Sequence, residues 1–280
     1  MSINDDYQRI GERIARHLGH PQIAGMHLPT PVDDEDFRDE FGFVFLADGS
    51  VGPFYVSMGG MLQQLRTRYP EPARFSADTA ELLTGFSERG LPERALALGA
   101  YNALSAALYR RAHYVPPDRA AAAAQQWPPA GNRVGMVGYF RPLVDRLLGK
   151  GAEVVVLERV PQRIPAREGI TATTVAADLR ACSQVLCTAS TLVNDSLDEL
   201  LATLGGGVRI ELIGPSGSGA PDPLFARGIA SVGGIQFGDR TQLLAQLAAG
   251  ESWGGAGRKF EVTPPDYPGI DALLRRARPD

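Results

Sequence analysis

Apolar positions in the second half of the chain follow two alternating patterns. Short, continuous apolar runs predict buried strands, and the segments between them, where apolar residues recur at helical spacing, predict surface helices. Continuous apolar strands that alternate with helices are typical of a parallel sheet covered on both faces. We therefore predict a Rossmann-like α/β fold here. The predicted strands are 133–139, 153–157, 184–188, 208–213 and 229–232, and the predicted helices are 142–148, 195–204 and 241–248.

The first half shows the pattern of a smaller α+β unit. Ile10, Ile14 and Leu18 are spaced i, i+4 and i+8, which places them on one face of a helix. Farther on, two apolar runs flank Asp48-Gly49, a pair that accepts the positive φ angles of a tight hairpin turn. The elements predicted in this half are helices over 6–18, 78–86 and 92–111 and hairpin strands over 41–46 and 51–56.

A proline-rich seam separates the two halves. Two Pro-Pro pairs, at 116–117 and 128–129, bracket an alanine run at 120–124, which we expect to form a short helix. Proline removes a backbone donor and disfavours helix in the preceding residue, so this stretch is typical of a boundary. We predict a smaller α+β domain over 1–115, a linker over 116–131, a Rossmann-like domain over 132–250 and a C-terminal extension over 251–280.

Composition and charge argue against several classes of protein. Of 280 residues, 44% are hydrophobic and 21% are charged, which is ordinary for a folded chain. With 28 Lys and Arg against 32 Asp and Glu, the net charge is −4, so we expect neither nucleic acid nor an anionic membrane as a partner. The two cysteines fit a reducing compartment, and we see neither a signal-peptide pattern nor an apolar run of about 18 residues. We therefore expect a cytoplasmic protein.

Polar residues gather where the predicted parallel strands end. Ligands of such sheets bind outside the carboxyl ends of the strands, near the switch in strand order. The loops there carry hydroxyls, an amide, an arginine and a carboxylate, which suit a polar or anionic small molecule. These loops are 138–142, 158–159, 190–194 and 214–216.

The first of these loops argues against a nicotinamide cofactor. Gly135 and Gly138 lack the G-x-G-x-x-G spacing that lets a backbone approach pyrophosphate. Arg141 stands near the place of the helix-proximal glycine, where its side chain would obstruct a dinucleotide. Glu158 could accept a ribose hydroxyl at the end of its strand, or it could be a solvated residue paired with Arg159. We therefore expect that the protein does not bind NAD.

Candidate metal ligands are few. His17 and His20 are spaced i, i+3, which can place two imidazoles on one helical face, and His27 follows seven residues later. Gly19 and Pro21 indicate that the helix ends in this region. The alternative interpretation is therefore that these histidines are helix-cap and loop residues.

The remaining polar motifs leave the chemistry open. Cys182 and Cys187 are five residues apart, unlike a C-x-x-C pair, and we expect Cys187 to be buried in a strand. The sequence contains no G-x-S-x-G elbow, H-E-x-x-H helix or Walker A loop. Tyr101 and Asn102 are polar residues in an otherwise apolar helix, so they either face a cleft or satisfy a buried backbone group.

Several stretches resemble a known pair of domains. Four stretches of the second half, in order, resemble the heavy-metal chelation domain family: 137–144 (VGYFRPLV), 154–159 (VVVLER), 187–197 (CTASTLVNDSL) and 212–216 (LIGPS). Upstream, 93–105 and the hairpin resemble the enolase-N-terminal-like domain that commonly precedes it. The resemblance extends over 35–250. It implies an enolase-N-like fold joined to a Rossmann-like fold, with a site where the two meet.

The resemblance also implies a set of ligand-binding residues in that cleft. Two positions depart from the family, because Ala189 and Asp195 stand where it often has glycine. The histidine cluster lies outside the matching motifs. The candidate ligand-binding residues are Asn102, Tyr139, Arg141, Pro142, Glu158, Ser190, Thr191, Asn194, Gly214, Pro215 and Ser216, and the candidate metal ligands are His17, His20 and His27.

Two functions fit these observations. The resemblance, together with a polar cleft that lacks a catalytic set, favours a protein that binds or handles a metal chelate or a divalent or heavy-metal ion. The alternative is an enzyme that acts on a small anionic metabolite during biosynthesis of a metal-binding compound, with Glu158 as general base. Exposed apolar helix faces would suit a homodimer.

Overall fold

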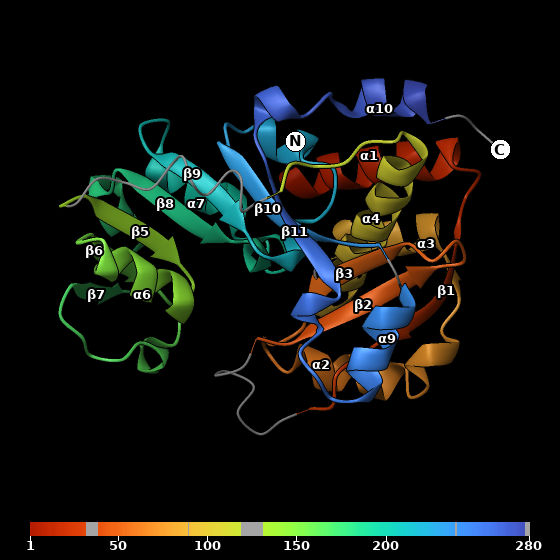
Figure 1. The fold of residues 1–280 in the computed structure, drawn as a ribbon, viewed down its shortest axis with the longest axis horizontal. Helices are drawn as coiled ribbons and strands as arrows, with labels where there is room; N and C mark the ends of the chain where they lie inside the picture. The colour runs from red at the N-terminus through yellow and green to blue at the C-terminus, as the bar shows by residue number, and fades with distance from the viewer. Residues whose placement is uncertain (32–38, 89, 119–130, 239, 278–280) are drawn as a thin grey trace.

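Two sheets form the framework of the molecule (Figure 1). The computed structural model describes residues 1–31, 39–88, 90–118, 131–238 and 240–277. The first sheet is antiparallel and has the order β3-β2-β1-β4. Its strands are β1 (Gln22–His27), β2 (Phe41–Leu46), β3 (Val51–Tyr55) and β4 (Ala77–Asp78).

One long helix packs across this sheet and is buried over most of its length. It is α4 (Leu91–Arg111), whose small residues let its backbone approach β3 closely. The predicted hairpin and the predicted helix 92–111 are confirmed within one residue. The predicted helix 78–86 is an α-helix only as far as Leu83 and continues as a 3-10 turn. The other helices of this part are α1 (Ile3–His17), α2 (Met61–Arg68) and α3 (Thr79–Leu83).

The second sheet has seven strands in the order β11-β10-β9-β8-β5-β6-β7. Neighbouring strands are parallel except for β11, which runs antiparallel to β10. The predicted mixed α/β fold with a mainly parallel sheet is therefore confirmed. The strands are β5 (Arg133–Val137), β6 (Glu153–Leu157), β7 (Ile170–Thr173), β8 (Gln184–Thr188), β9 (Arg209–Ile213), β10 (Ser231–Phe237) and β11 (Gly257–Val262).

The helices of the second part are shorter than α4. None of the helices in the ranges given above is long and apolar enough to cross a membrane. Residues 119–130, and with them the predicted alanine helix and most of the predicted linker, lie outside the described residues. The helices are α6 (Arg141–Gly149), α7 (Leu197–Leu204), α8 (Asp222–Phe225), α9 (Arg240–Ala248) and α10 (Ile270–Arg276).

Several strands differ from the sequence-based expectation, among them β1 and β4 of the first sheet, neither of which was predicted. Strand β10 begins two residues later than predicted and runs on to Phe237, because Gly233-Gly234 interrupts its apolar run without breaking the strand. Strand β7 was not predicted, since it is a short edge strand with an exposed centre and no apolar run. Strand β11 was not predicted either, because Arg258, Lys259 and Glu261 leave it without a continuous apolar run.

The connection between β10 and β11 crosses to the first sheet. Helix α9 lies beside β2 in Figure 1, and its Leu243 belongs to one hydrophobic cluster with Phe43 and Phe45. Trp253, farther along this connection, packs edge-on against Phe41 and Phe43, with ring centroids 5.4 and 5.2 Å apart. One chain segment therefore fastens the two sheets together, and β11, within the predicted C-terminal extension, completes the large sheet.

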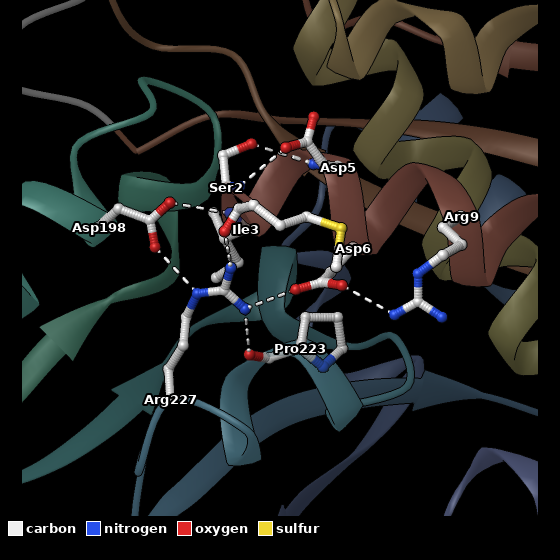
Figure 2. A network of polar contacts seen from close by, with 9 residues as sticks. Ser2, Ile3, Asp5, Asp6, Arg9, Asp198, Pro223 and Arg227 are labelled. Carbon is white, nitrogen blue, oxygen red and sulfur yellow. Dashed lines mark hydrogen bonds and ion pairs between the residues drawn. The ribbon is translucent and has the colours of Figure 1, made fainter.

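Arg227 makes a second connection, by ion pairs and hydrogen bonds, between the start of α1 and the second part of the chain (Figure 2). Its Nε donates to Asp198 Oδ1 at 2.9 Å and its Nη1 donates to Asp6 Oδ2 at 3.0 Å. The other oxygen of Asp198 accepts the backbone N–H of Ile3 at 2.8 Å. Partial burial opposes the charged form of Asp6, but hydrogen bonds from Arg9 and Arg227 outweigh it and hold the pKa of Asp6 below its usual value.

Arg227→Met is expected to lower the free energy of unfolding by about 2 kcal/mol, because it leaves two partly buried carboxylates without their shared cation. Urea unfolding followed by circular dichroism measures the loss. Arg9→Met is the matched control: Arg9 also bonds to Asp6 but is half exposed, so it should cost less than about 1 kcal/mol. The loss of unfolding free energy in Arg227→Met should become smaller as the pH falls below about 4. In that range Asp6 protonates first in the unfolded chain and then in the folded one. Equal losses from the two variants would contradict this account.

Candidate functional site

A cavity of about 720 Å³ lies where the carboxyl ends of β5, β6, β8 and β9 meet the first sheet. Chain order along the large sheet reverses between β5 and β8, so the cavity is at the switch point where open α/β sheets bind ligands. The first sheet contributes Phe41 and Tyr55 to the wall, at the edge formed by β2 and β3. Loops that are distant in sequence therefore converge on one space.

Eight of the eleven predicted ligand-binding residues line this cavity. They come from all four of the strand-end loops that the sequence singled out. They are Tyr139, Glu158, Ser190, Thr191, Asn194, Gly214, Pro215 and Ser216.

The other three predicted residues are not among the cavity-lining residues of the described chain. Arg141 has a side chain that is 79% exposed and points to Asp145 on its own helix, and Pro142 follows it in α6. Asn102 is buried behind the wall, where its Nδ2 donates to the carbonyls of Pro53 at 2.8 Å and Ser216 at 3.0 Å. Asn102 was expected either to face a cleft or to satisfy a buried backbone group, and in the structure it does the second.

The loop after β8 is shaped by its own side chains. Thr188 Oγ1 accepts the N–H of Ser190 at 3.2 Å, and Thr191 Oγ1 donates to the carbonyl of Thr188 at 2.7 Å. Asn194 Oδ1 accepts both the N–H and the hydroxyl of Ser196. These bonds, together with one between the Ser190 and Thr188 hydroxyls at 3.0 Å, fix the loop whose Ser190, Thr191 and Asn194 line the cavity.

Two helices of the first part hold the same loop from behind. Asp195 has a φ of 59°, and its Oδ1 accepts from Asn4 of α1 at 2.8 Å. Arg94 of α4 donates to the carbonyl of Val193 at 3.0 Å. Helix α7 consequently begins at Leu197, two residues later than predicted, because Asp195 is in the left-handed region and cannot be its first helical residue.

Glu158 is a buried carboxylate at the end of β6. The residue is only 8% exposed, and its Oε1 accepts the N–H of Val160 at 3.1 Å. No ion pair to Arg159 occurs in the part of the chain that is described, so the interpretation of Glu158 as a solvated, paired strand end is wrong. Its second oxygen, Oε2, has no hydrogen-bond or ion-pair partner among those residues.

Sequence reasoning missed a polar group on the opposite wall. Arg163 Nη2 and the Tyr55 hydroxyl both donate to Asp39 Oδ1, at 3.2 and 3.1 Å. Burial, reinforced by the Asp39 carboxylate, raises the pKa of Tyr55 well above its usual value, so the phenol keeps its proton. Arg163 lies in a short 3-10 turn without periodicity, so no local pattern indicates that it faces the site.

The histidines suggested as metal ligands are not brought together. His17 ends α1 and lies 2.6 Å from the carbonyl of Ala277 through its Nε2, and His20 follows in an exposed turn. His27 is on β1, where burial and then the Arg66 charge lower its pKa. Within the described ranges there is no group of three or more His, Cys, Asp or Glu that could hold a metal ion.

The cysteines are also poorly suited to a heavy metal. Burial raises the pKa of the Cys187 thiol to about 12, although a hydrogen bond with Thr191 opposes the shift. Burial raises the pKa of Cys182 as well. Because the thiolate is the form that binds metals, neither side chain is prepared to be a soft ligand at neutral pH.

Two crystal structures share this architecture. One is a protein of unknown function from Pyrococcus horikoshii, with 17% identity, a TM-score of 0.65, and coverage of 92% of this chain and 99% of that one. The other, from Desulfitobacterium hafniense DCB-2, has 19% identity, a TM-score of 0.65, and coverage of 92% and 98%. At such identities the likeness shows the fold alone.

Both crystal structures are described as members of the DUF364 family. No curated protein matches the chain. The model of that family, whose description reads "Putative heavy-metal chelation", matches residues 124–263, half of the chain. The chain therefore belongs to the DUF364 family, as its four strand-end stretches predicted.

Proposed function

We propose that this protein binds a small organic molecule in the cavity between its two sheets, and that a heavy metal reaches it as a complex with such a molecule. One observation carries the proposal: eight strand-end residues line a cavity of about 720 Å³, whereas the described residues hold no three-ligand metal group. That volume is within the range of pockets for small organic ligands, about 300 to 1,000 Å³, and is far larger than a bare ion needs.

Charges of both signs line the cavity: the carboxylates Asp39, Glu158 and Glu199, and two arginines that suit the negative groups of a metal complex. Arg163 has a side chain that is 17% exposed, donates to Asp39 and also interacts with Tyr55 and Glu158. Its remaining N–H groups can meet a ligand in the cavity that it lines. Arg159 lies at the same end of β6 and also lines the cavity. The loop after β8 adds residues with hydroxyl and amide groups to the cavity lining, namely Ser190, Thr191 and Asn194. Metal complexes of polycarboxylates combine negative charge with hydrogen-bonding groups. The arginines would bind the negative charge, and the hydroxyls and the amide would bind the hydrogen-bonding groups.

Isothermal titration with metal salts and with their preformed complexes tests the proposal. Zinc, nickel and cobalt chlorides should give no saturable heat, and their citrate or histidine complexes should bind. Arg163→Met should weaken the citrate complexes about tenfold or more, because a charge-assisted hydrogen bond is lost. Arg141→Met is the matched control and should change nothing, since its side chain lies away from the cavity. Tight binding of the free ions, or no binding of any complex, would refute the proposal.

A second candidate function rests on Glu158. A carboxylate that is buried in a ligand cavity and keeps one oxygen free can take a proton from a bound substrate. This would make the protein an enzyme acting on a small anionic metabolite, in line with biosynthesis of a metal-binding compound. An activity screen with small carboxylic and phosphorylated metabolites tests it. A reaction that survives unchanged in Glu158→Gln would eliminate Glu158 as the base.

A further inference from the structure

The β6 end of the cavity has a carboxylate, Glu158, whose hydrogen-bonding capacity is only partly used by the fold. Glu158 is more than nine-tenths buried, yet among the described residues only the N–H of Val160 bonds to its carboxylate, through Oε1. Burying a carboxylate is costly unless its oxygens are hydrogen-bonded. Oε2 is not among the fully enclosed side-chain oxygens without a partner, so it opens to the cavity, where Arg163 supplies a positive charge and a ligand can supply donors.

The position of Glu158 in the sheet indicates which donors these are. The strands β7-β6-β5-β8-β9-β10 have the order 3-2-1-4-5-6, which is the order of nucleotide-binding sheets. Glu158 follows the second strand in sequence, about twenty residues after the glycine turn at Gly138. In sheets of this order, an acidic residue at that place accepts the hydroxyls of a ribose.

The turn after β5 is poorly suited to binding a diphosphate. Gly138 has a φ of 80°, but Tyr139 and Phe140 follow it where a diphosphate-binding loop would have small residues. Helix α6 then has Pro142 in its first turn, which removes one of the N–H groups that a diphosphate would use. We therefore expect the ligand at Glu158 to carry no diphosphate.

The surroundings of Glu158 suit a flat, apolar group. Val160, after β6, and Ala176, after β7, both line the cavity. The ends of these two strands are joined by a hydrogen bond from the Glu158 N–H to the Thr173 carbonyl at 3.0 Å. Val175, next to Ala176, is 54% exposed, which is unusual for a large apolar side chain beside a cavity. A planar base attached to the ribose would cover these side chains.

We propose that the β6 end of the cavity is a ribonucleoside subsite. Glu158 accepts hydrogen bonds from the 2′- and 3′-hydroxyls, the base lies against Val160 and Ala176, and the 5′ substituent is not a diphosphate. This inference rests on the proposed function, because it requires that the cavity bind a small organic molecule, and it names the chemical class of that molecule.

The test compares ribonucleosides with their 2′-deoxy counterparts by isothermal titration and saturation-transfer NMR. Adenosine, guanosine, cytidine and uridine are titrated first, and at least one should bind at millimolar concentration or below. Its 2′-deoxy form should bind about tenfold more weakly, since it lacks one hydroxyl for the carboxylate. NAD should bind no better than the nucleoside, because its diphosphate gains no contact. Equal binding of the ribo and 2′-deoxy forms would overturn the inference, and so would failure of all the nucleosides.

Variants of Glu158, which follows β6, and of Glu153, the first residue of β6, complete the test. Glu158→Gln should weaken the ribonucleoside about tenfold and leave the 2′-deoxy form nearly unchanged, because both changes remove the same interaction. Gln keeps an acceptor for the Val160 N–H, so the fold should persist; if it does not, the wild-type comparison still decides. Glu153→Gln, exposed at the far end of the same strand, should bind like wild type. Metal–citrate binding without nucleoside binding refutes this inference alone, whereas loss of both refutes the proposed function too.

Discussion

Gly52→Ala is expected to lower the free energy of unfolding by more than about 4 kcal/mol, or to prevent folding altogether. A Cβ at this position would lie 1.9 Å from the carbonyl oxygen of Gly99 and 2.5 Å from the backbone nitrogen of Ala103. Both are main-chain atoms of α4, so no side-chain rotation can relieve the overlap. The helix would have to move off β3, and with it the buried contacts of Phe54, whose ring also packs against Gly99.

The experiment for Gly52 is urea unfolding followed by circular dichroism, with Gly206→Ala as the matched control. A Cβ at Gly206 meets nothing within 4 Å, and its φ is not in the left-handed region, so the control should stay within about 0.5 kcal/mol of wild type. Because β3 ends at Tyr55 in the cavity wall, any folded fraction of Gly52→Ala should also bind ligands poorly. Wild-type stability of Gly52→Ala would show that α4 and β3 are less closely packed than described.

Local pattern predicted the parts of the fold that have strong periodicity. The hairpin over β2 and β3 was predicted from apolar runs around Asp48-Gly49, and the parallel strands β5, β6, β8 and β9 from continuous apolar runs. Strand β11 was not, because its first three residues, Gly257, Arg258 and Lys259, include no apolar side chain, and its place is set by pairing with β10. Which strands pair is decided by contacts distant in sequence, and periodicity within one segment carries no information on them.

The site was predictable to the extent that it consists of strand ends. The rule that ligands bind at the carboxyl ends of parallel strands selected the loops after β5, β6, β8 and β9, and all four line the cavity. The opposite wall was not predictable, because Asp39, Tyr55 and Arg163 come from three separate segments and meet only in the folded chain. Asn102 was assigned to the cleft from the family resemblance, and its polarity left two interpretations open, whereas its role follows from two carbonyls that no sequence pattern reveals.

Those two carbonyls make Asn102 the buried link between the first sheet and the cavity. Its Nδ2 joins Pro53 of β3 to Ser216, and Ser216 Oγ in turn accepts the N–H of Tyr55 at 3.0 Å. Asn102→Ala removes both donors and leaves two buried acceptors unsatisfied, so we expect a loss of about 3 kcal/mol in urea unfolding. The loop that presents Ser216 should move, and binding at the cavity should weaken along with stability. Binding that stays at the wild-type level in Asn102→Ala would show that this link does not shape the site.

Ser105→Ala separates stability from site geometry, because Ser105 is equally buried on α4 and its hydroxyl accepts the N–H of Ala220, away from the cavity. It should lower stability by about 1 to 2 kcal/mol without changing binding. Asn102→Asp is the sharper variant, since it keeps the shape and replaces the amide donor with an oxygen facing two carbonyls. Burial would raise the pKa of the new carboxyl in the folded state, so stability should be best preserved below about pH 4 and fall as the pH rises through that raised value. Below it, the protonated carboxyl can donate one hydrogen bond, and above it a buried charge faces two acceptors. A stability curve for Asn102→Asp parallel to that of wild type across this range would mean that the side chain at 102 is not held between Pro53 and Ser216.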